Sequence, residues 1–156
     1  DVAALQKRLR EFAAALALDH LVLDTHPGLN RETLLTTAVA DALIVLVRPD
    51  RQDFHGTAVL NEIASRLKAP AAWIVANKVP GRLDAEALAA KMRDMFEREV
   101  VAVLPLAEDL MLLGSAGLFI RQQPTHPYAL AVKGVADRLI ARADAAAAVP
   151  GTGAAP

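Results

Sequence analysis

The sequence has no cysteine, few aromatic residues, little net charge and no long apolar run. The absence of Cys excludes a disulfide framework, a thiolate zinc site and a Cys-ligated iron–sulfur cluster. A formal net charge of −1 gives no overall field that would attract nucleic acid or an anionic membrane, and no specific nucleic-acid signal is evident. Charged residues interrupt every apolar run before it reaches roughly 18 residues, so no transmembrane segment is predicted. The default expectation is a cytoplasmic protein.

What is present is the composition of a globular domain. Hydrophobic residues make up 54% of the 156 residues, charged residues 22% and aromatic residues 4%, so the core must consist mainly of Ala, Leu and Val side chains. The length suits one domain or a large piece of one. The chain begins at Asp1 and not at Met, as a processed, trimmed or incompletely determined product would.

Helical segments alternate with short apolar runs along the chain. Helices are predicted at residues 2–17, 31–40, 53–68, 85–97, 108–113 and 127–147. Strands are predicted at residues 21–24, 42–47, 71–76 and 100–104. Asn30 and Asp84 stand directly before two of the helices and are residue types that cap helix N-termini.

This alternation predicts an α/β fold with a mostly parallel sheet and helices on both faces. One domain is expected over residues 1–148, and the low-complexity tail 149–156 is predicted to be disordered. In such sheets, ligands bind at the carboxyl ends of the strands. The residues directly after each predicted strand are therefore the candidates for a functional site.

The first candidate is Asp24, which ends the apolar run at residues 21–23. An acid at the end of a buried strand matches a Walker B motif, in which the carboxylate holds a water of a nucleotide-bound Mg²⁺. The loop that follows, Thr25-His26-Pro27-Gly28, is a place where the γ-phosphate of a nucleotide can be sensed. The competing interpretation is that Asp24 simply ends a strand, as acids do in many α/β proteins.

The second candidate is Asn77-Lys78, which follows the predicted strand at 71–76. The pair matches the start of the Asn-Lys-x-Asp motif that recognises guanine, but Pro80 occupies the position of the acid. The acceptor for the guanine N–H groups is therefore missing, which favours adenine. An Asn that serves only as a turn residue is the structural alternative.

These motifs, taken in order, resemble the MinD/ParA family of ATPases over roughly residues 19–140. The segment 19–29 resembles the family's Walker B and switch II region, and Asn77-Lys78-Val79 its adenine-side loop. Val103-Leu104-Pro105, with the acids that follow it, resembles the loop that lies along the base. The resemblance implies a partial P-loop NTPase fold and an enzyme that dimerises around ATP and hydrolyses it as a switch in cell division or in chromosome or plasmid partitioning.

The resemblance also implies cofactors, ATP and Mg²⁺, and a role for particular residues. It places Asp24 at the catalytic position, where the residue would hold the metal through water. The switch loop that contacts the cofactor would contain Thr25, Pro27 and Gly28. The adenine side of the site would contain Asn77, Lys78, Pro105 and Leu106.

The chain departs from the family in one large respect, because it has no Gly-Lys, Lys-Ser or Lys-Thr pair. The phosphate-binding loop of the family is built on such a sequence. The chain is therefore predicted to be the C-terminal portion of a longer ATPase and to be inactive alone. Its expected partners are a second copy, an N-terminal portion that carries the P-loop, and a protein cargo or activator. His26 also stands where the family often has Pro.

Two other interpretations remain open at this point. The chain could be a non-enzymatic partner-binding or dimerisation module that lacks the phosphate-binding loop. It could also be a receiver-like signalling domain, but the acidic pair and the Lys-Pro expected of such domains are absent. If the chain is either the C-terminal portion of an ATPase or a binding module, its partial sheet has an open edge. An N-terminal portion, a partner chain or a second copy must cover that edge.

Overall fold

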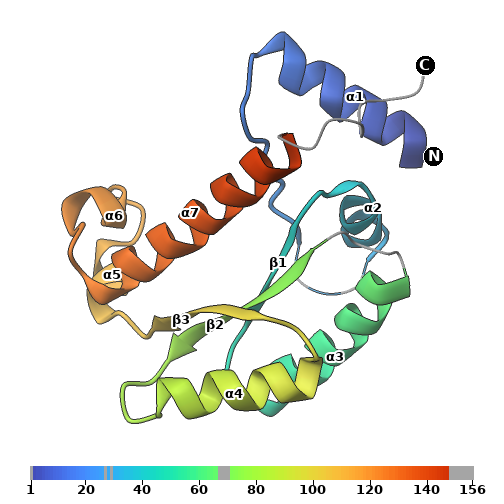
Figure 1. Cartoon of the computed structure of the whole chain (residues 1–156). Coiled ribbons are helices and arrows are strands. Elements are labelled where there is room, and N and C mark those ends of the chain that lie inside the picture. Colours follow the sequence, from blue (N-terminus) through green and yellow to red (C-terminus); the bar gives the residue numbers. More distant parts are fainter. Residues whose placement is uncertain (1, 27, 29, 67–70, 148–156) are drawn as a thin grey trace.

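A three-stranded parallel sheet forms the centre of the protein (Figure 1). The computed structural model describes residues 2–26, 28, 30–66 and 71–147. Its strands, in the spatial order β1-β2-β3, are β1 (Leu43–Val47), β2 (Ala72–Val79) and β3 (Val100–Pro105). Both strand pairs are parallel, with Val47 opposite Ala76 and Val79 opposite Pro105. The carboxyl ends of all three strands therefore lie at one edge of the sheet.

Helices cover both faces of this sheet, which confirms the predicted fold class. Helices α3 and α4 lie on one face, and α7 lies on the other, against β3 (Figure 1). Helix α1 contacts α2. The helices are α1 (Val2–Ala15), α2 (Arg31–Val39), α3 (Arg51–Arg66), α4 (Ala85–Phe96), α5 (Glu108–Leu113), α6 (Phe119–Gln122) and α7 (Pro127–Ala147). No helix in the described ranges is both long and apolar enough to cross a membrane.

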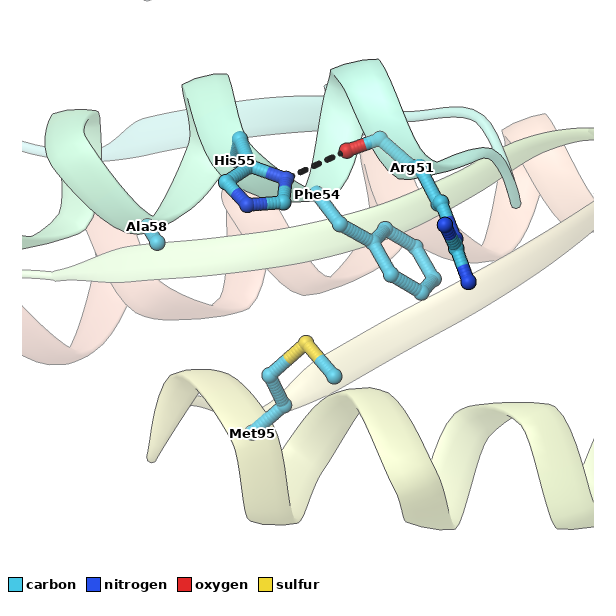
Figure 2. Close-up of a pocket in the computed structure, with 5 residues that line it drawn as sticks. All are labelled: Arg51, Phe54, His55, Ala58 and Met95. Carbon is cyan, nitrogen blue, oxygen red and sulfur yellow. Dashed lines mark hydrogen bonds between the residues drawn. The ribbon is translucent and has the colours of Figure 1, made fainter.

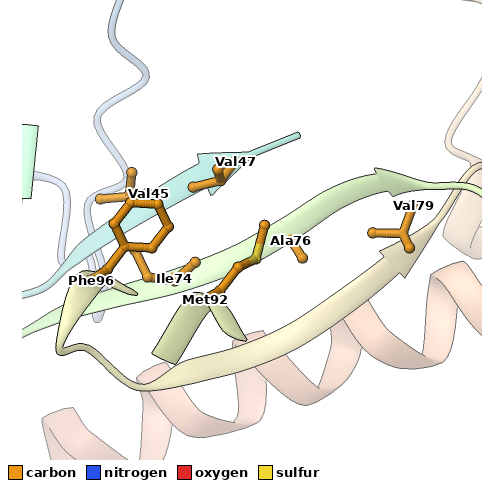
Figure 3. Close-up of a cluster of buried hydrophobic side chains, with 7 residues drawn as sticks. All are labelled: Val45, Val47, Ile74, Ala76, Val79, Met92 and Phe96. Carbon is orange, nitrogen blue, oxygen red and sulfur yellow. The ribbon is translucent and has the colours of Figure 1, made fainter. Parts of the chain in front are cut away.

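The main core lies between the sheet and the α3–α4 layer (Figure 3). Val45 and Val47 point into it from β1, since alternate residues of a strand share a face. Met92 and Phe96 are buried beneath them from α4. The rings of Phe54 and Phe96 meet edge to face, with centroids 5.8 Å apart, and join α3 to α4.

The predicted helix caps are confirmed. The Oδ1 atom of Asn30 accepts a hydrogen bond of 2.8 Å from the backbone N–H of Thr33 at the start of α2. The Oδ1 atom of Asp84 accepts bonds of 2.9 Å and 3.1 Å from the backbone N–H groups of Glu86 and Ala87 at the start of α4. Each carboxamide or carboxylate satisfies N–H groups that have no partner within the helix.

The predicted strand at residues 21–24 is wrong for this chain. The structure has irregular backbone from residue 20 to residue 26, and the Val22 side chain is 85% exposed. A strand exists only when its backbone N–H and C=O groups find a neighbouring strand. No described strand pairs with this segment, so its apolar composition is not enough to form one.

Two further differences concern the length and number of elements. Strand β2 extends through Asn77 and Lys78, which were predicted to lie in a loop. The short helix α6 was not predicted. The last predicted residues of the third helix, at 67–68, and the tail at 149–156 lie outside the described residues.

Candidate functional site

The predicted adenine-side residues lie together at the carboxyl ends of β2 and β3. The backbone N–H of Leu106 donates a hydrogen bond of 2.8 Å to the carbonyl of Val79. Pro105 is paired with Val79 in the sheet, and Asn77 precedes Val79 by two residues. The ladder between β2 and β3 is irregular between Ala76 and Val79. The backbone at this edge therefore departs from regular pleating at Asn77 and Lys78.

Asn77 is positioned by its own neighbour. Its Oδ1 atom accepts a hydrogen bond of 2.9 Å from the backbone N–H of Lys78, and Lys78 has a φ of +54°. A left-handed backbone at a residue with a side chain is uncommon, and such backbones concentrate at functional sites. The Asn77 side chain is half-buried, and its Nδ2 group donates no hydrogen bond to another described residue. This arrangement leaves the amide N–H₂ as a donor toward a ligand.

The predicted metal-side residues lie in a different part of the described structure. Asp24 and Thr25 are exposed in the irregular segment before α2. The Thr33 hydroxyl of α2 lies 3.0 Å from Asn30 Oδ1 and 3.4 Å from the carbonyl of His26, and its single proton can be donated to only one of these acceptors. Gly28 has a φ of +92°, a backbone conformation that favours glycine, and Pro27 lies outside the described residues. Among the described residues, no hydrogen bond or ion pair joins this loop to Asn77 or Pro105.

Asp24 is the single carboxylate to which the sequence analysis assigned a metal. The described residues contain no group of three His, Asp or Glu side chains that could hold an ion. A Mg²⁺ ion that keeps most of its waters needs only one or two protein carboxylates, with the rest of its shell supplied by phosphates. An exposed carboxylate such as Asp24 suits contact with a water of a nucleotide-bound ion and does not form a metal site by itself.

The carboxyl end of β1 carries an ion cluster whose pairing the sequence analysis did not identify. The guanidinium of Arg48 donates two hydrogen bonds of 2.9 Å to the carboxylate of Asp53, and the Arg48 backbone N–H donates a third, of 3.0 Å. The backbone N–H of Asp53 donates in turn to Asp50. The hydrogen bonds from Arg48 hold the pKa of the Asp53 carboxyl below its ordinary value, and the same contact raises the pKa of Arg48. This cluster fixes the turn from β1 into α3.

A surface groove between α3 and α4 is a separate feature (Figure 2). It has a volume of about 420 Å³ and a mostly apolar lining. In it the Nδ1 atom of His55 lies 2.8 Å from the carbonyl of Arg51. The lining residues are Arg51, Phe54, His55, Ala58 and Met95. None of the predicted site residues lines this groove, and we place the candidate site at the strand ends, where polar groups meet irregular backbone.

The chain has a MinD-like fold. The chain superimposes on the MinD cell division protein of Aquifex aeolicus with a TM-score of 0.75 and 16% sequence identity, over 90% of this chain and 61% of that one. It superimposes on a chain of the MinC:MinD cell division protein complex of the same organism with a TM-score of 0.78 and 15% identity, over 90% and 59%. The chain thus spans less than two thirds of these MinD chains. No protein-family model and no curated protein matches the sequence.

Proposed function

We propose that this chain is the C-terminal part of a MinD-like ATPase that acts as an ATP-dependent dimerising switch in intracellular positioning or partitioning. The observation that carries the proposal is the convergence of Asn77, Pro105 and Leu106 at neighbouring strand ends of a MinD-like fold. Ligands of α/β proteins bind at this edge of the sheet. The order of the motifs along the chain supports the same assignment.

The proposed residues would contact a nucleotide at two places, the adenine base and the phosphates with their Mg²⁺ ion. The free Nδ2 group of Asn77 would donate a hydrogen bond to an acceptor nitrogen of adenine, while Pro105 and Leu106 offer apolar contact to the base. Asp24 would hold a water of the Mg²⁺ ion, which neutralises charge on the phosphates during hydrolysis. Thr25, Pro27 and Gly28 would form the loop that responds to the terminal phosphate.

The sequence contains no phosphate-binding loop motif of its own. The glycine-rich loop with a Lys-Ser or Lys-Thr pair, which cradles phosphates with backbone N–H groups, is absent from the sequence. An N-terminal portion of the protein would supply it. We therefore expect the 156-residue chain alone to bind ATP very weakly and to hydrolyse none.

Protein partners are expected at two levels. A MinD-like switch dimerises around ATP, so a second copy is the first partner. The structural likeness to a chain taken from a MinC:MinD cell division complex supports a further protein as cargo or activator. A cytoplasmic location follows from this role.

The second candidate function is a non-enzymatic module that binds a partner or dimerises. It is favoured by the missing Gly-Lys sequence and by the separation of the Asp24 loop from the adenine-side residues. The two candidates differ in one simple respect, because only the ATPase requires Asp24 for turnover.

The test is ATP hydrolysis by the native protein purified from its source cells. We expect Mg²⁺-dependent hydrolysis, and we expect Asp24→Asn to lower it about 100-fold or more, since the charge that holds the metal is lost. Asp19→Asn is the matched control, because Asp19 is an exposed carboxylate directly before the same irregular segment. It should leave hydrolysis unchanged.

Two results would overturn the proposal. A native protein that neither binds nor hydrolyses ATP would favour the non-enzymatic module. Hydrolysis that Asp24→Asn and Asp19→Asn leave equally unchanged would remove Asp24 from the site.

A further inference from the structure

His126 caps the N-terminus of α7 with its imidazole ring. The backbone N–H of Tyr128 donates a hydrogen bond of 3.1 Å to the Nδ1 atom of His126. The carbonyl of His126 accepts another, of 3.0 Å, from the backbone N–H of Leu130. The first N–H groups of a helix have no partner within that helix. The ring therefore takes the place of the Ser, Thr, Asp or Asn side chain that is preferred at this position.

The same ring joins α7 to α6, which lies by the N-terminal end of α7 (Figure 1). The centroids of the His126 and Phe119 rings are 5.1 Å apart, and the rings meet edge to face. Tyr128 meets Phe119 in the same manner, with centroids 6.0 Å apart. Phe119 is only 5% exposed, so this aromatic cluster is a buried contact between the two helices.

Helix α6 depends on this contact for its position. It has four residues, of which Phe119 is the buried one, and no side chain caps its N-terminus. A helix of one turn is not stable in water without tertiary packing. Loss of the contact with His126 would therefore loosen α6 as well as the first turn of α7.

Protonation of His126 opposes this arrangement. A backbone N–H can only donate, so Nδ1 must be unprotonated to accept the bond from Tyr128. A proton on Nδ1 removes that bond and places a positive charge at the positive end of the dipole of α7. The unfolded chain takes up the proton without these costs, so a falling pH weakens the folded form.

The charged groups around His126 do not offset this cost. On α6 the charged side chain is Arg121, which is exposed and also positive. The sequence has no Asp or Glu between Asp109, at the start of α5, and Asp137 on α7. Asp137 forms an ion pair with Lys133. Among the described residues, no carboxylate forms an ion pair with His126.

The other histidines do not share this geometry. The Nδ1 atom of His55 faces the carbonyl of Arg51 at 2.8 Å. A carbonyl can only accept, so the ring donates, and that bond survives protonation. His20 and His26 are exposed, and their rings form no hydrogen bond to another described residue. His126 is therefore the histidine whose bond requires the neutral ring.

We propose that His126 is a pH-sensitive cap, whose protonation frees the first turn of α7 and loosens α6. The change would occur between about pH 8 and pH 5, the range in which histidines titrate. Along the chain, α5 and α6 lie between Leu106 and α7, so the loosened segment directly follows the candidate site. The inference goes beyond the proposed function and does not depend on ATP binding.

Thermal unfolding of the native protein, purified from its source cells, tests the inference. His126→Asn keeps a capping side chain that cannot be protonated. Between pH 7.5 and pH 5.5, the melting temperature of the wild type should fall by about 2–4 °C relative to that of His126→Asn. The lost ring contact with Phe119 adds a difference that does not vary with pH, so the change with pH is the readout.

His20→Asn is the matched control, because it removes an exposed histidine. The difference in melting temperature between the wild type and His20→Asn should stay constant within about 1 °C over the same pH range. A difference between the wild type and His126→Asn that also stays constant would contradict the pH-sensitive cap.

Amide hydrogen exchange of the wild type tests the same inference without a variant. The protection of the Tyr128 N–H, corrected for the intrinsic effect of pH on exchange, should be about 10-fold lower at pH 5.5 than at pH 7.5. The amides of α4 should keep their protection. Equal protection of Tyr128 at both pH values would overturn the inference, as would a nitrogen NMR spectrum in which Nδ1 of His126 is protonated at pH 7.5.

Discussion

At the scale of single residues, Asn77 gives the most specific prediction about nucleotide binding at the candidate site. Its Oδ1 atom accepts a hydrogen bond from the backbone N–H of Lys78, and we propose that its Nδ2 group donates to the base. Asn77→Asp keeps the acceptor for Lys78 and removes that donor. We expect this change to weaken ATP binding by the native protein about 10-fold or more, the equivalent of one hydrogen bond, as titration calorimetry would measure.

Asn77→Ala is the companion variant, because it removes both the donor and the acceptor. It should weaken binding at least as much as Asn77→Asp, and it should also loosen the backbone at Lys78. If Asn77→Asp binds ATP as tightly as the wild type, the Nδ2 group does not contact the nucleotide.

Asp53 gives a prediction about pH. Its carboxyl accepts hydrogen bonds from Arg48, which hold its pKa below the ordinary value of 3.8. A lowered pKa means that the ionised carboxylate stabilises the folded chain above that ordinary value, and that this contribution is lost as the pH falls through the lower, folded-state pKa. Asp53→Asn should therefore cost about 0.5–1 kcal/mol near pH 7, the range of a partly exposed ion pair.

The measurement is urea unfolding of both proteins from pH 7 to pH 3. The difference in unfolding free energy should be constant near neutral pH and should shrink as the Asp53 carboxyl becomes protonated below about pH 4. Asp50→Asn is the comparison variant and should cost less unfolding free energy. The Asp50 carboxylate lies 3.5 Å from the Nε atom of Arg48, which is a longer contact than that of Asp53. A difference that does not vary with pH would mean that charge at Asp53 contributes nothing.

At the scale of elements, Met92 and Phe96 join α4 to the sheet through the main core. Met92 is fully buried in the core, whereas Met95, three residues later on the same helix, is 48% exposed. Met92→Ala should lower the unfolding free energy by about 2–5 kcal/mol through lost burial and a residual cavity. Met95→Ala should change it by less than about 0.5 kcal/mol. Similar losses for the two variants in chemical denaturation would mean that α4 does not pack as described.

The elements also show what the sequence could and could not predict. Helix α2, whose Asn30 cap lies within the chain, was found from the sequence, and so was β1, an apolar run that pairs with β2. The segment at 21–24 was not, because a strand depends on a neighbour that the local sequence does not supply. The closeness of Asn77 to Pro105 followed from parallel strand order, and their role in binding remains a prediction. The pairing of Arg48 with Asp53 depends on the geometry of one turn, and no pattern in the sequence indicates it.

At the scale of the whole molecule, the chain matches part of the length of the MinD chains that share its fold. Its three-stranded parallel sheet has one open apolar edge, and the chain covers 61% and 59% of the two MinD chains that share its fold. The residues proposed for the adenine side are present, while the Gly-Lys-Ser or Gly-Lys-Thr sequence of a phosphate-binding loop is absent. All of these features have one explanation if an N-terminal portion completes both the sheet and the nucleotide site.

The most direct test of that explanation is the intact mass of the native protein in its source cells, with peptide sequencing upstream of Asp1. We predict roughly one hundred or more additional residues, about the difference between this chain and a nucleotide-binding domain of ordinary size. They should include a glycine-rich turn with Gly-Lys-Ser or Gly-Lys-Thr. A native protein that begins at or near Asp1 would contradict the account and leave a binding module without ATPase activity.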